Sequence, residues 1–220
     1  MFIGHFTPAL IAAAQPKAAG LGALFVAAQL VDIGFAAVVI PGIEAMRIVP
    51  GIAAMNPMDL YHMPFTHSLL GAGAWAAAFA LLVGLVTKRR EAAIGVALVV
   101  ISHWFLDLLV HIPDLTLFGT PPKLGLGLWN HPLLEMPLEI ALTGGALLYY
   151  AARTRAVGGN GRLWLLAGLL ALVQAADWFG PKETVYSIAI PATMLAAYAV
   201  LAAAAAWAGR NRRPTIRAGT

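Results

Sequence analysis

The sequence predicts an all-α membrane protein, built as a polytopic bundle of transmembrane helices. Hydrophobic residues make up 60% of the 220-residue chain and charged residues only 11%. Long runs of Ala, Leu, Val and Gly recur along it, each about the 20 residues that a helix needs to cross a bilayer. Basic residues cluster in alternate loops between these runs, as they do in multi-pass proteins. These three observations predict six long spans and a short N-terminal helix.

The apolar runs give the elements in order. The first apolar piece, Phe2 to Ala14, ends at Gln15-Pro16. At about 1.5 Å per residue it reaches only about 20 Å, so we expect a half-helix rather than a full crossing. No basic residue precedes it, which is not typical of a signal peptide. The six predicted spans cover about residues 20–40, 67–87, 91–112, 132–152, 162–180 and 184–208.

Turn and capping residues mark the ends of several spans. Ser68 or Thr66 is a candidate N-cap for the second span. Pro113 follows the third span and closes it. Asn130, followed by His131-Pro132, predicts the start of the fourth span. Gly and Asn residues at 158–161 predict a loop between the fourth and fifth spans.

The loop charges predict the orientation. Only Arg47, Lys123 and Lys182 among the 14 basic residues fall on one side, which leaves 14 − 3 = 11 on the other. The positive-inside rule makes that second side cytoplasmic. Residues 1–209 are thus expected to form one transmembrane domain, and 210–220 a basic cytoplasmic tail. The longer loops, about 41–66 and 113–131, face outside. The sequence predicts a multi-pass protein of a bacterial inner (cytoplasmic) membrane.

Composition also excludes some functions. The chain has no cysteine, which excludes disulfides, thiolate metal ligands and a cysteine nucleophile. The basic charge belongs to loops and reports topology, so we expect no nucleic-acid partner. Membrane lipid is the expected partner, and Gly71, Gly73, Gly84, Gly144 and Gly145 would allow close helix contacts within the chain or with a protein partner.

The third span carries the sharpest polar pattern. His103, Asp107 and His111 are spaced by four residues, and Asp114 continues the series. At about 100° per residue these side chains share one helical face, which must turn away from lipid. A His and an Asp four residues apart can bind one metal ion, or the Asp can orient the imidazole. A hydrogen-bonded packing pair explains the same spacing equally well.

Two neighbouring spans carry similar groups. His131, Glu135 and Glu139 again repeat every four residues in the fourth span. Two carboxylates on one helical face repel unless a cation, a proton or a base neutralises them. His67 opens the second span, five residues after His62, and is the better ligand candidate because His62 could be a loop residue in water.

Two blocks of the chain resemble a known family. His62-x-x-x-Thr66-His67-Ser68 followed by Ser102-His103-x-x-Leu106-Asp107 resembles the paired blocks of the LexA-regulated, inner-membrane metal-dependent hydrolases, over roughly residues 1–115. The resemblance adds His5 and Asp32, which stand where that family has an early His and an Asp-bearing segment. It implies a metal site formed by three or four of His5, Asp32, His67, His103 and Asp107.

The residue types agree with that implication. Imidazoles and carboxylates without thiolate suit Zn²⁺, and could also hold Mn²⁺, Fe²⁺ or Ni²⁺. A catalytic metal lowers the pKa of bound water to about 7. Glu135 or Glu139 would then be the general base, and His111 would protonate the leaving group. A site that opens into the outer leaflet predicts a lipid or envelope ester or phosphoester as substrate.

Two other classes of function fit parts of the pattern. An Asp/His/Glu series can relay protons or ions in a transporter. The cytoplasmic halves of the six spans are nearly bare of polar groups, which counts against a pathway across the full thickness. The protein could instead be a non-catalytic structural or accessory subunit of a membrane complex. Asp177, at the external end of the fifth span, is expected to be solvated.

Overall fold

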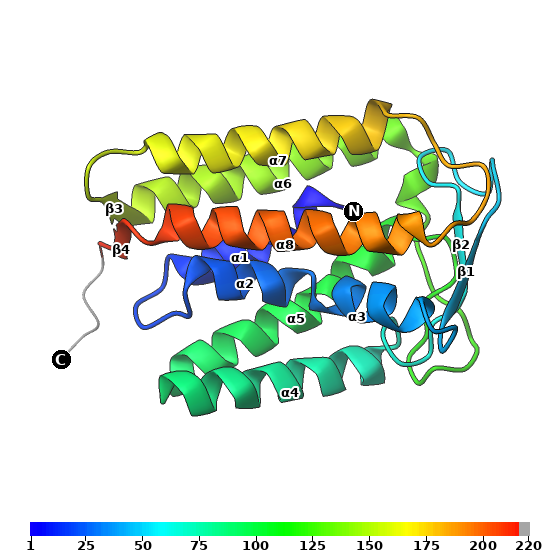
Figure 1. Cartoon of the computed structure of the whole chain (residues 1–220), viewed down its shortest axis with the longest axis horizontal. Coiled ribbons are helices and arrows are strands. Elements are labelled where there is room, and N and C mark those ends of the chain that lie inside the picture. The colour runs from blue at the N-terminus through cyan, green and yellow to red at the C-terminus, as the bar shows by residue number, and fades with distance from the viewer. Residues whose placement is uncertain (216–220) are drawn as a thin grey trace.

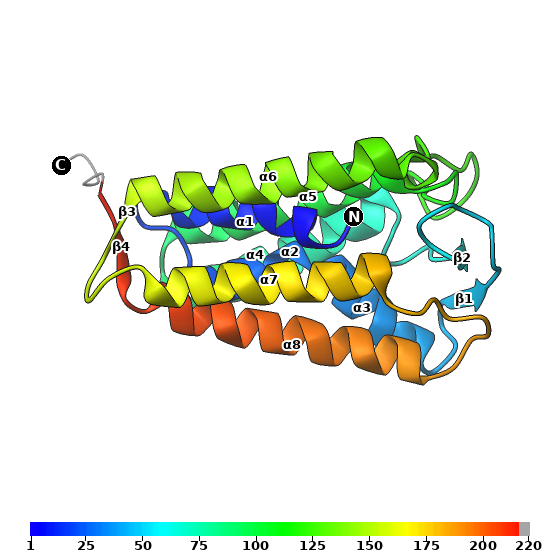
Figure 2. The same ribbon diagram turned by 90° about the horizontal axis from the view of Figure 1, so that it is seen from above.

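A computed structural model describes residues 1–215 and is predominantly helical (Figure 1). Its helices lie side by side along one long axis, with the short α1 and α2 among the longer ones (Figure 2). The helices are η1 (Ile3–His5), α1 (Phe6–Ala13), α2 (Leu21–Ala28), α3 (Leu30–Val39), α4 (Leu69–Thr87), α5 (Arg90–Val110), η2 (Leu128–Asn130), α6 (Pro132–Arg153), α7 (Gly161–Phe179) and α8 (Ala189–Gly209). The strands are β1 (Ala45–Ile48), β2 (Met58–His62), β3 (Thr154–Ala156) and β4 (Arg212–Pro214).

Four helices have the length and composition of membrane spans. Within residues 1–215 these are α4, α5, α7 and α8, and the bent pair of α2 and α3 makes a fifth if it is one broken span. Large apolar side chains such as Leu81, Leu98 and Leu165 project outward and are more than 60% exposed. An exposed apolar helix surface indicates contact with lipid. The expected membrane association is therefore confirmed at this level. α6 has 22 residues but is not among these spans, and it carries Glu135 and Glu139.

The predicted span at 20–40 is not one continuous helix. It breaks at Gln29, whose φ of −112° and ψ of 11° leave the helical region, and α2 and α3 meet at 55°. Neither Pro nor Gly marks the break, so local sequence does not predict it. Tertiary contacts stabilise it instead: the Gln29 side chain donates a hydrogen bond to the Phe2 carbonyl (3.3 Å), and the Ala28 carbonyl contacts His103 Nδ1 (2.7 Å).

The two long loops are ordered and lie at one end of the bundle (Figure 1). β1 and β2 form an antiparallel hairpin within the 41–66 loop, with an ion pair between Arg47 and Asp59 (2.7 Å). The start of α4 is held to the 113–131 loop, because Leu69 N donates to Thr116 O (3.0 Å). Ser68 caps α4 as predicted, with its Oγ accepting from Gly71 N (2.9 Å).

At the other end, β3 pairs with β4. The predicted tail at 210–220 is thus partly built into the fold, and its residues 216–220 lie outside the described part. The N-cap predicted at Asn130 is also off by one residue, since α6 begins at Pro132 with His131 in the N-cap position.

Candidate metal centre

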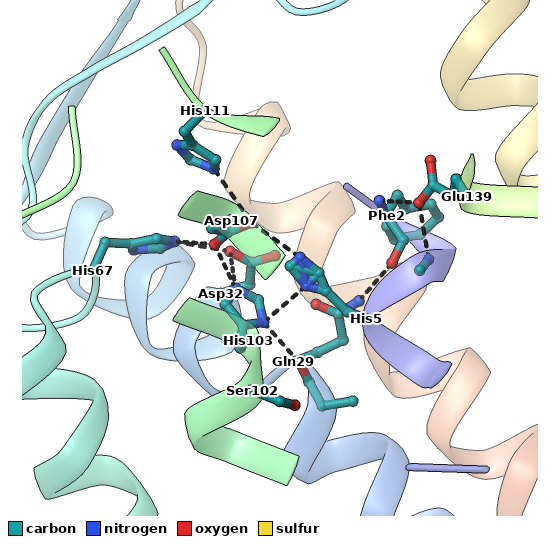
Figure 3. Close-up of polar contacts among 12 residues, drawn as sticks. Phe2, His5, Gln29, Asp32, His67, Ser102, His103, Asp107, His111 and Glu139 are labelled. Carbon is teal, nitrogen blue, oxygen red and sulfur yellow. Dashed lines mark hydrogen bonds and ion pairs between the residues drawn. The ribbon is translucent and has the colours of Figure 1, made fainter. Parts of the chain in front are cut away.

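Six polar side chains from four segments of the chain meet inside the bundle (Figure 3). The bend between α2 and α3, the capped start of α4 and the last two turns of α5 bring them together. All are buried except Asp32, whose side chain is 19% exposed. They are His5 from η1, Asp32 from α3, His67 before α4, His103 and Asp107 from α5, and His111 at its end.

Asp107 lies at the centre of this cluster. Its Oδ1 is 3.0 Å from His5 Nε2 and 3.4 Å from His111 Nε2. Its Oδ2 is 3.0 Å from His103 Nε2 and 3.7 Å from His67 Nε2. One carboxylate therefore faces four imidazoles.

Asp32 provides the second carboxylate. Its Oδ1 lies 3.3 Å from His67 Nε2 and 3.5 Å from His103 Nε2, while its Oδ2 accepts a hydrogen bond from the Tyr198 hydroxyl (2.8 Å). Asp32 is also in the first turn of α3, where the helix dipole favours negative charge. The break at Gln29 creates that helix start within the bundle.

The outer ring nitrogen of His103 has a fixed partner. Its Nδ1 faces the Ala28 carbonyl at 2.7 Å, and a carbonyl can only accept, so Nδ1 carries a hydrogen. His5 Nδ1 also lies 3.2 Å from this atom. In a neutral ring with hydrogen on Nδ1, the lone pair is on Nε2, the atom that faces Asp32 and Asp107.

His67 also carries a hydrogen on Nδ1, because of two polar neighbours, Thr66 and Glu44. Glu44 Oε2 accepts the Thr66 hydroxyl hydrogen (2.5 Å), and Glu44 Oε1 accepts from the backbone N–H groups of Phe65 and Thr66. The Thr66 oxygen lies 2.9 Å from His67 Nδ1. Since the single hydroxyl hydrogen goes to the carboxylate, Nδ1 must donate to Thr66, and Nε2 again presents a lone pair to the cluster.

With both rings neutral, the centre therefore has acceptors facing acceptors. The lone pairs of His67 Nε2 and His103 Nε2 point at carboxylate oxygens, and His103 Nε2 and Asp107 Oδ2 have no hydrogen-bond partner within the described residues. Buried groups in this arrangement need protons or a metal cation between them. Two sets have ligand atoms within 4.8 Å of one another, His5–His103–Asp107 and Asp32–His67–His103, and either could hold a metal ion.

His111 has a different environment. Its Nδ1 is 2.9 Å from Asp114 Oδ1, and its ring lies 4.2 Å from that of Trp129, centroid to centroid. His111 is in neither three-residue ligand set. A carboxylate that orients an imidazole beside a polar site is an arrangement suited to proton transfer.

The predicted catalytic glutamates lie apart from the cluster but share a cavity with it. This cavity of about 420 Å³ is lined by Asp32, His67, Asp107 and His111 on one side, and by Glu135 and Glu139 on another. Glu139 Oε1 accepts from Phe2 N (2.5 Å) and Gly4 N (2.8 Å). The structure thus brings the five predicted metal ligands together with His111, and leaves the exposed His62 and His131 outside.

Sequence reasoning missed the residues that orient these ligands. Glu44 lies in a loop with no periodic pattern, and Tyr198 is a single hydroxyl in an Ala-rich helix, so neither has a local signal. Glu44 is buried in the fold although it lies in a Pro- and Gly-containing loop, and nothing in the sequence indicates this burial.

These observations define a helical protein with membrane-length apolar helices and a buried His/Asp centre that could hold a metal ion. Comparison of the chain with models of protein families, with curated proteins and with solved structures gives no match. The function must therefore be argued from the centre itself.

Proposed function

We propose that this protein is a metal-dependent hydrolase embedded in the inner membrane, acting on a lipid or envelope ester or phosphoester at the outer leaflet. The observation that carries this proposal is the pair of Nδ1-protonated histidines, His67 and His103, whose Nε2 atoms face Asp32 and Asp107 beside a cavity. The resemblance to the LexA-regulated membrane hydrolases supports the same conclusion.

The residues present fit a divalent metal. Histidine ligands in metal sites donate their second N–H to a carbonyl or carboxylate, as His103 does to Ala28 and as His67 does through Thr66 to Glu44. Two or three imidazoles with one or two carboxylates favour Zn²⁺. When bound, such an ion supplies Lewis acidity and makes water a better nucleophile.

His111 is the residue we propose to move protons. Asp114 fixes its ring, and its Nε2 points toward Asp107 at the cavity wall. This placement favours His111 over Glu139 as the acid–base group, because Glu139 Oε1 is already engaged by two backbone amides. Such a dyad holds the imidazole in one orientation while it accepts and returns a proton.

The proposed orientation in the membrane and the proposed substrate rest on the position of the cluster and on the apolar helix surfaces. The cluster lies toward the end of the bundle that carries β1 and β2, the end that the positive-inside rule assigns to the outside. The apolar helix surfaces give lipid direct access to the protein. We therefore propose an amphiphile of the outer leaflet, rather than a water-soluble ester, as the substrate.

Metal analysis of detergent-purified protein tests the proposal directly. We expect about one or two Zn²⁺ per chain, loss of the metal in His103→Ala, and retention in the matched control His62→Ala, which changes an exposed loop histidine. Hydrolysis of short-chain lipid esters and phosphoesters in mixed micelles should depend on the metal and fall strongly in His111→Asn, while its metal remains bound. A wild-type protein without metal that tolerates these changes would support the accessory-subunit alternative.

A further inference from the structure

The cavity beside the centre has two chemically different walls. It lies between α3, α6, α7, α8 and the loop around residues 48–60. One wall is the His/Asp centre, and most of the remaining lining is apolar, including Phe35, Ile48, Val173 and Met194. Its volume of about 420 Å³ is within the usual range of about 300–1,000 Å³ for ligand pockets. A bare metal ion would fill only a small part of it.

Another part of the lining is acidic. Glu135, Glu139, Asp177 and Glu183 line it, and Lys182 is the one basic side chain there. Lys182 Nζ donates to the backbone carbonyl of Asp177, and across the described residues neither Glu135 nor Glu139 forms an ion pair. Two cationic groups, the Lys182 ammonium and the amino group of Met1, therefore lie near four carboxylates, so that acidic groups are in excess.

Glu135 is the group that needs a ligand. It is only 1% exposed, it lines the cavity, and its Oε2 has no hydrogen-bond partner among the described residues. Glu139 follows it by one helical turn and is also 1% exposed, so the two carboxylates repel each other. Two neighbouring buried carboxylates stay ionised together only if a donor or a cation reaches them, and otherwise they share a proton.

Hydrogen bonds fix the position of the Glu139 carboxylate. The N–H groups of Phe2 and Gly4 bind its Oε1, and Gln174, which accepts from Ile3 N, fixes the same N-terminal segment from α7. These bonds orient Glu139 on the cavity wall, next to the unpartnered Glu135. Two Trp residues, Trp129 and Trp178, also line the cavity.

We propose that Glu135 and Glu139 bind the ammonium group of a lipid headgroup, so that the substrate is an aminophospholipid or another ammonium-bearing amphiphile. Carboxylates and aromatic side chains together favour an organic ammonium. The apolar lining suits the attached chain, and the volume suits a headgroup rather than an ion. The assignment of this lipid as substrate rests on the proposed function, because it requires the phosphoester or ester to face the His/Asp centre.

Binding of short-chain lipids to the full-length protein tests the inference without any measurement of catalysis. The probes are dihexanoyl phosphatidylethanolamine and dihexanoyl phosphatidylglycerol, titrated calorimetrically into detergent-solubilised protein after chelation of metals. We expect the ethanolamine lipid to bind at least about tenfold more tightly, since one charged hydrogen bond contributes on that order. Equal binding of the two lipids would overturn the inference.

Three variants locate the binding group. Glu135→Gln keeps the shape and removes the charge, and should weaken ethanolamine-lipid binding about tenfold or more while metal content is unchanged. Asp177 is exposed, and Asp177→Asn should weaken ethanolamine-lipid binding by a smaller factor. This variant provides a second test if Glu135→Gln folds poorly. Glu91→Gln is the matched control, because Glu91 pairs with Lys17 far from this cavity. Normal ethanolamine-lipid binding by both Glu135→Gln and Asp177→Asn would also overturn the inference.

The same experiment separates the two proposals. Selective lipid binding by a wild-type protein that takes up no metal would end the hydrolase proposal and leave the ammonium site standing. Metal uptake without selectivity between the lipids would end the ammonium-site inference and leave the hydrolase proposal standing.

Discussion

The molecule buries polar and charged groups at several places, and two of them, Arg212 and the His/Asp centre, differ in how their donors and acceptors are matched. Arg212 is 7% exposed and donates four hydrogen bonds, to Thr154 Oγ1, Asn160 Oδ1 and the carbonyls of Ala151 and Thr154, at 2.6–3.2 Å. Its guanidinium also lies over the Tyr150 ring at 5.3 Å. Burial lowers its pKa, yet each of these contacts pairs a donor with an acceptor.

At the His/Asp centre, neutral His67 and His103 rings place lone pairs against carboxylate oxygens. His103 Nε2 and Asp107 Oδ2 are 3.0 Å apart, and neither has a hydrogen-bond partner within residues 1–215. The comparison teaches that burial of charge alone does not identify a functional site. Arg212 is satisfied by the fold and joins β4 to β3, whereas the centre needs additional protons or a metal cation between its acceptors.

Removal of the central carboxylate should have the largest effect. Asp107→Asn replaces an acceptor that faces four imidazoles with an amide that can donate hydrogens to the lone pairs of His67 and His103. We expect at least a hundredfold loss of metal affinity together with an unchanged or increased unfolding temperature of the metal-free protein. Metal titration and thermal unfolding measure the two quantities. Full metal retention by Asp107→Asn would show that metal binding does not depend on this carboxylate, and the contrast with the Arg212 site would be lost.

Acidification should act on the centre and leave the Arg212 contacts intact. Each imidazole nitrogen that binds metal must give up its proton, so metal affinity should fall as pH falls, by up to about tenfold per pH unit for each such imidazole. Arginine stays charged throughout this range. Metal affinity measured between pH 8 and pH 5 checks the slope, and a flat profile would contradict imidazole ligation.

Loss of the Glu44–Thr66–His67 contacts should have an intermediate effect. Thr66→Val keeps the side-chain shape and deletes the hydroxyl that fixes the His67 ring. Groups in this outer position typically contribute 10–100-fold to metal affinity. Ser68→Ala is the matched control: it removes the α4 cap, costs about 1 kcal/mol of stability, and should leave metal affinity unchanged.

Substitution of Arg212 should have the smallest effect on metal binding. Arg212→Ala removes four hydrogen bonds, and we expect a loss of about 2–4 kcal/mol of stability. Metal content per folded chain should stay at the wild-type value. A variant that unfolds no more easily than wild type would show that the β3–β4 end contributes little to stability.

The helices and the candidate ligands were predictable from the sequence to different degrees. Apolar runs of membrane length report directly on α4, α5, α7 and α8, and the spacing of His103 and Asp107 places both on one helical face. His5 and Asp32 have no such local signal, and only the family resemblance marked them. Their position beside Asp107 depends on contacts between distant segments.

Other features depend on tertiary contacts that produce no periodic pattern in the sequence. The break at Gln29 lacks Pro and Gly, and it is held by Phe2 and His103, which are far away in the sequence. Glu44 lies in a loop whose hairpin has too few residues per strand to show alternation. Arg212 was expected to be a solvated tail residue, since a basic segment is normally exposed, and the pairing of β4 with β3 overrides that expectation.

The position of the centre along its helices has an electrical consequence. His103 precedes the end of α5 by seven residues (110 − 103), and Asp32 precedes the end of α3 by seven (39 − 32), so each lies about 10 Å from the β1–β2 end along its helix. With the outer edge of the hydrocarbon core at the ends of α3 and α5, that is about a third of a core of about 30 Å. In the proposed orientation, a divalent cation that enters from outside crosses about a third of the membrane voltage, which favours occupancy by about 1.5 kcal/mol at 100 mV. Energisation of the membrane would then raise metal affinity by about tenfold without any change in the protein.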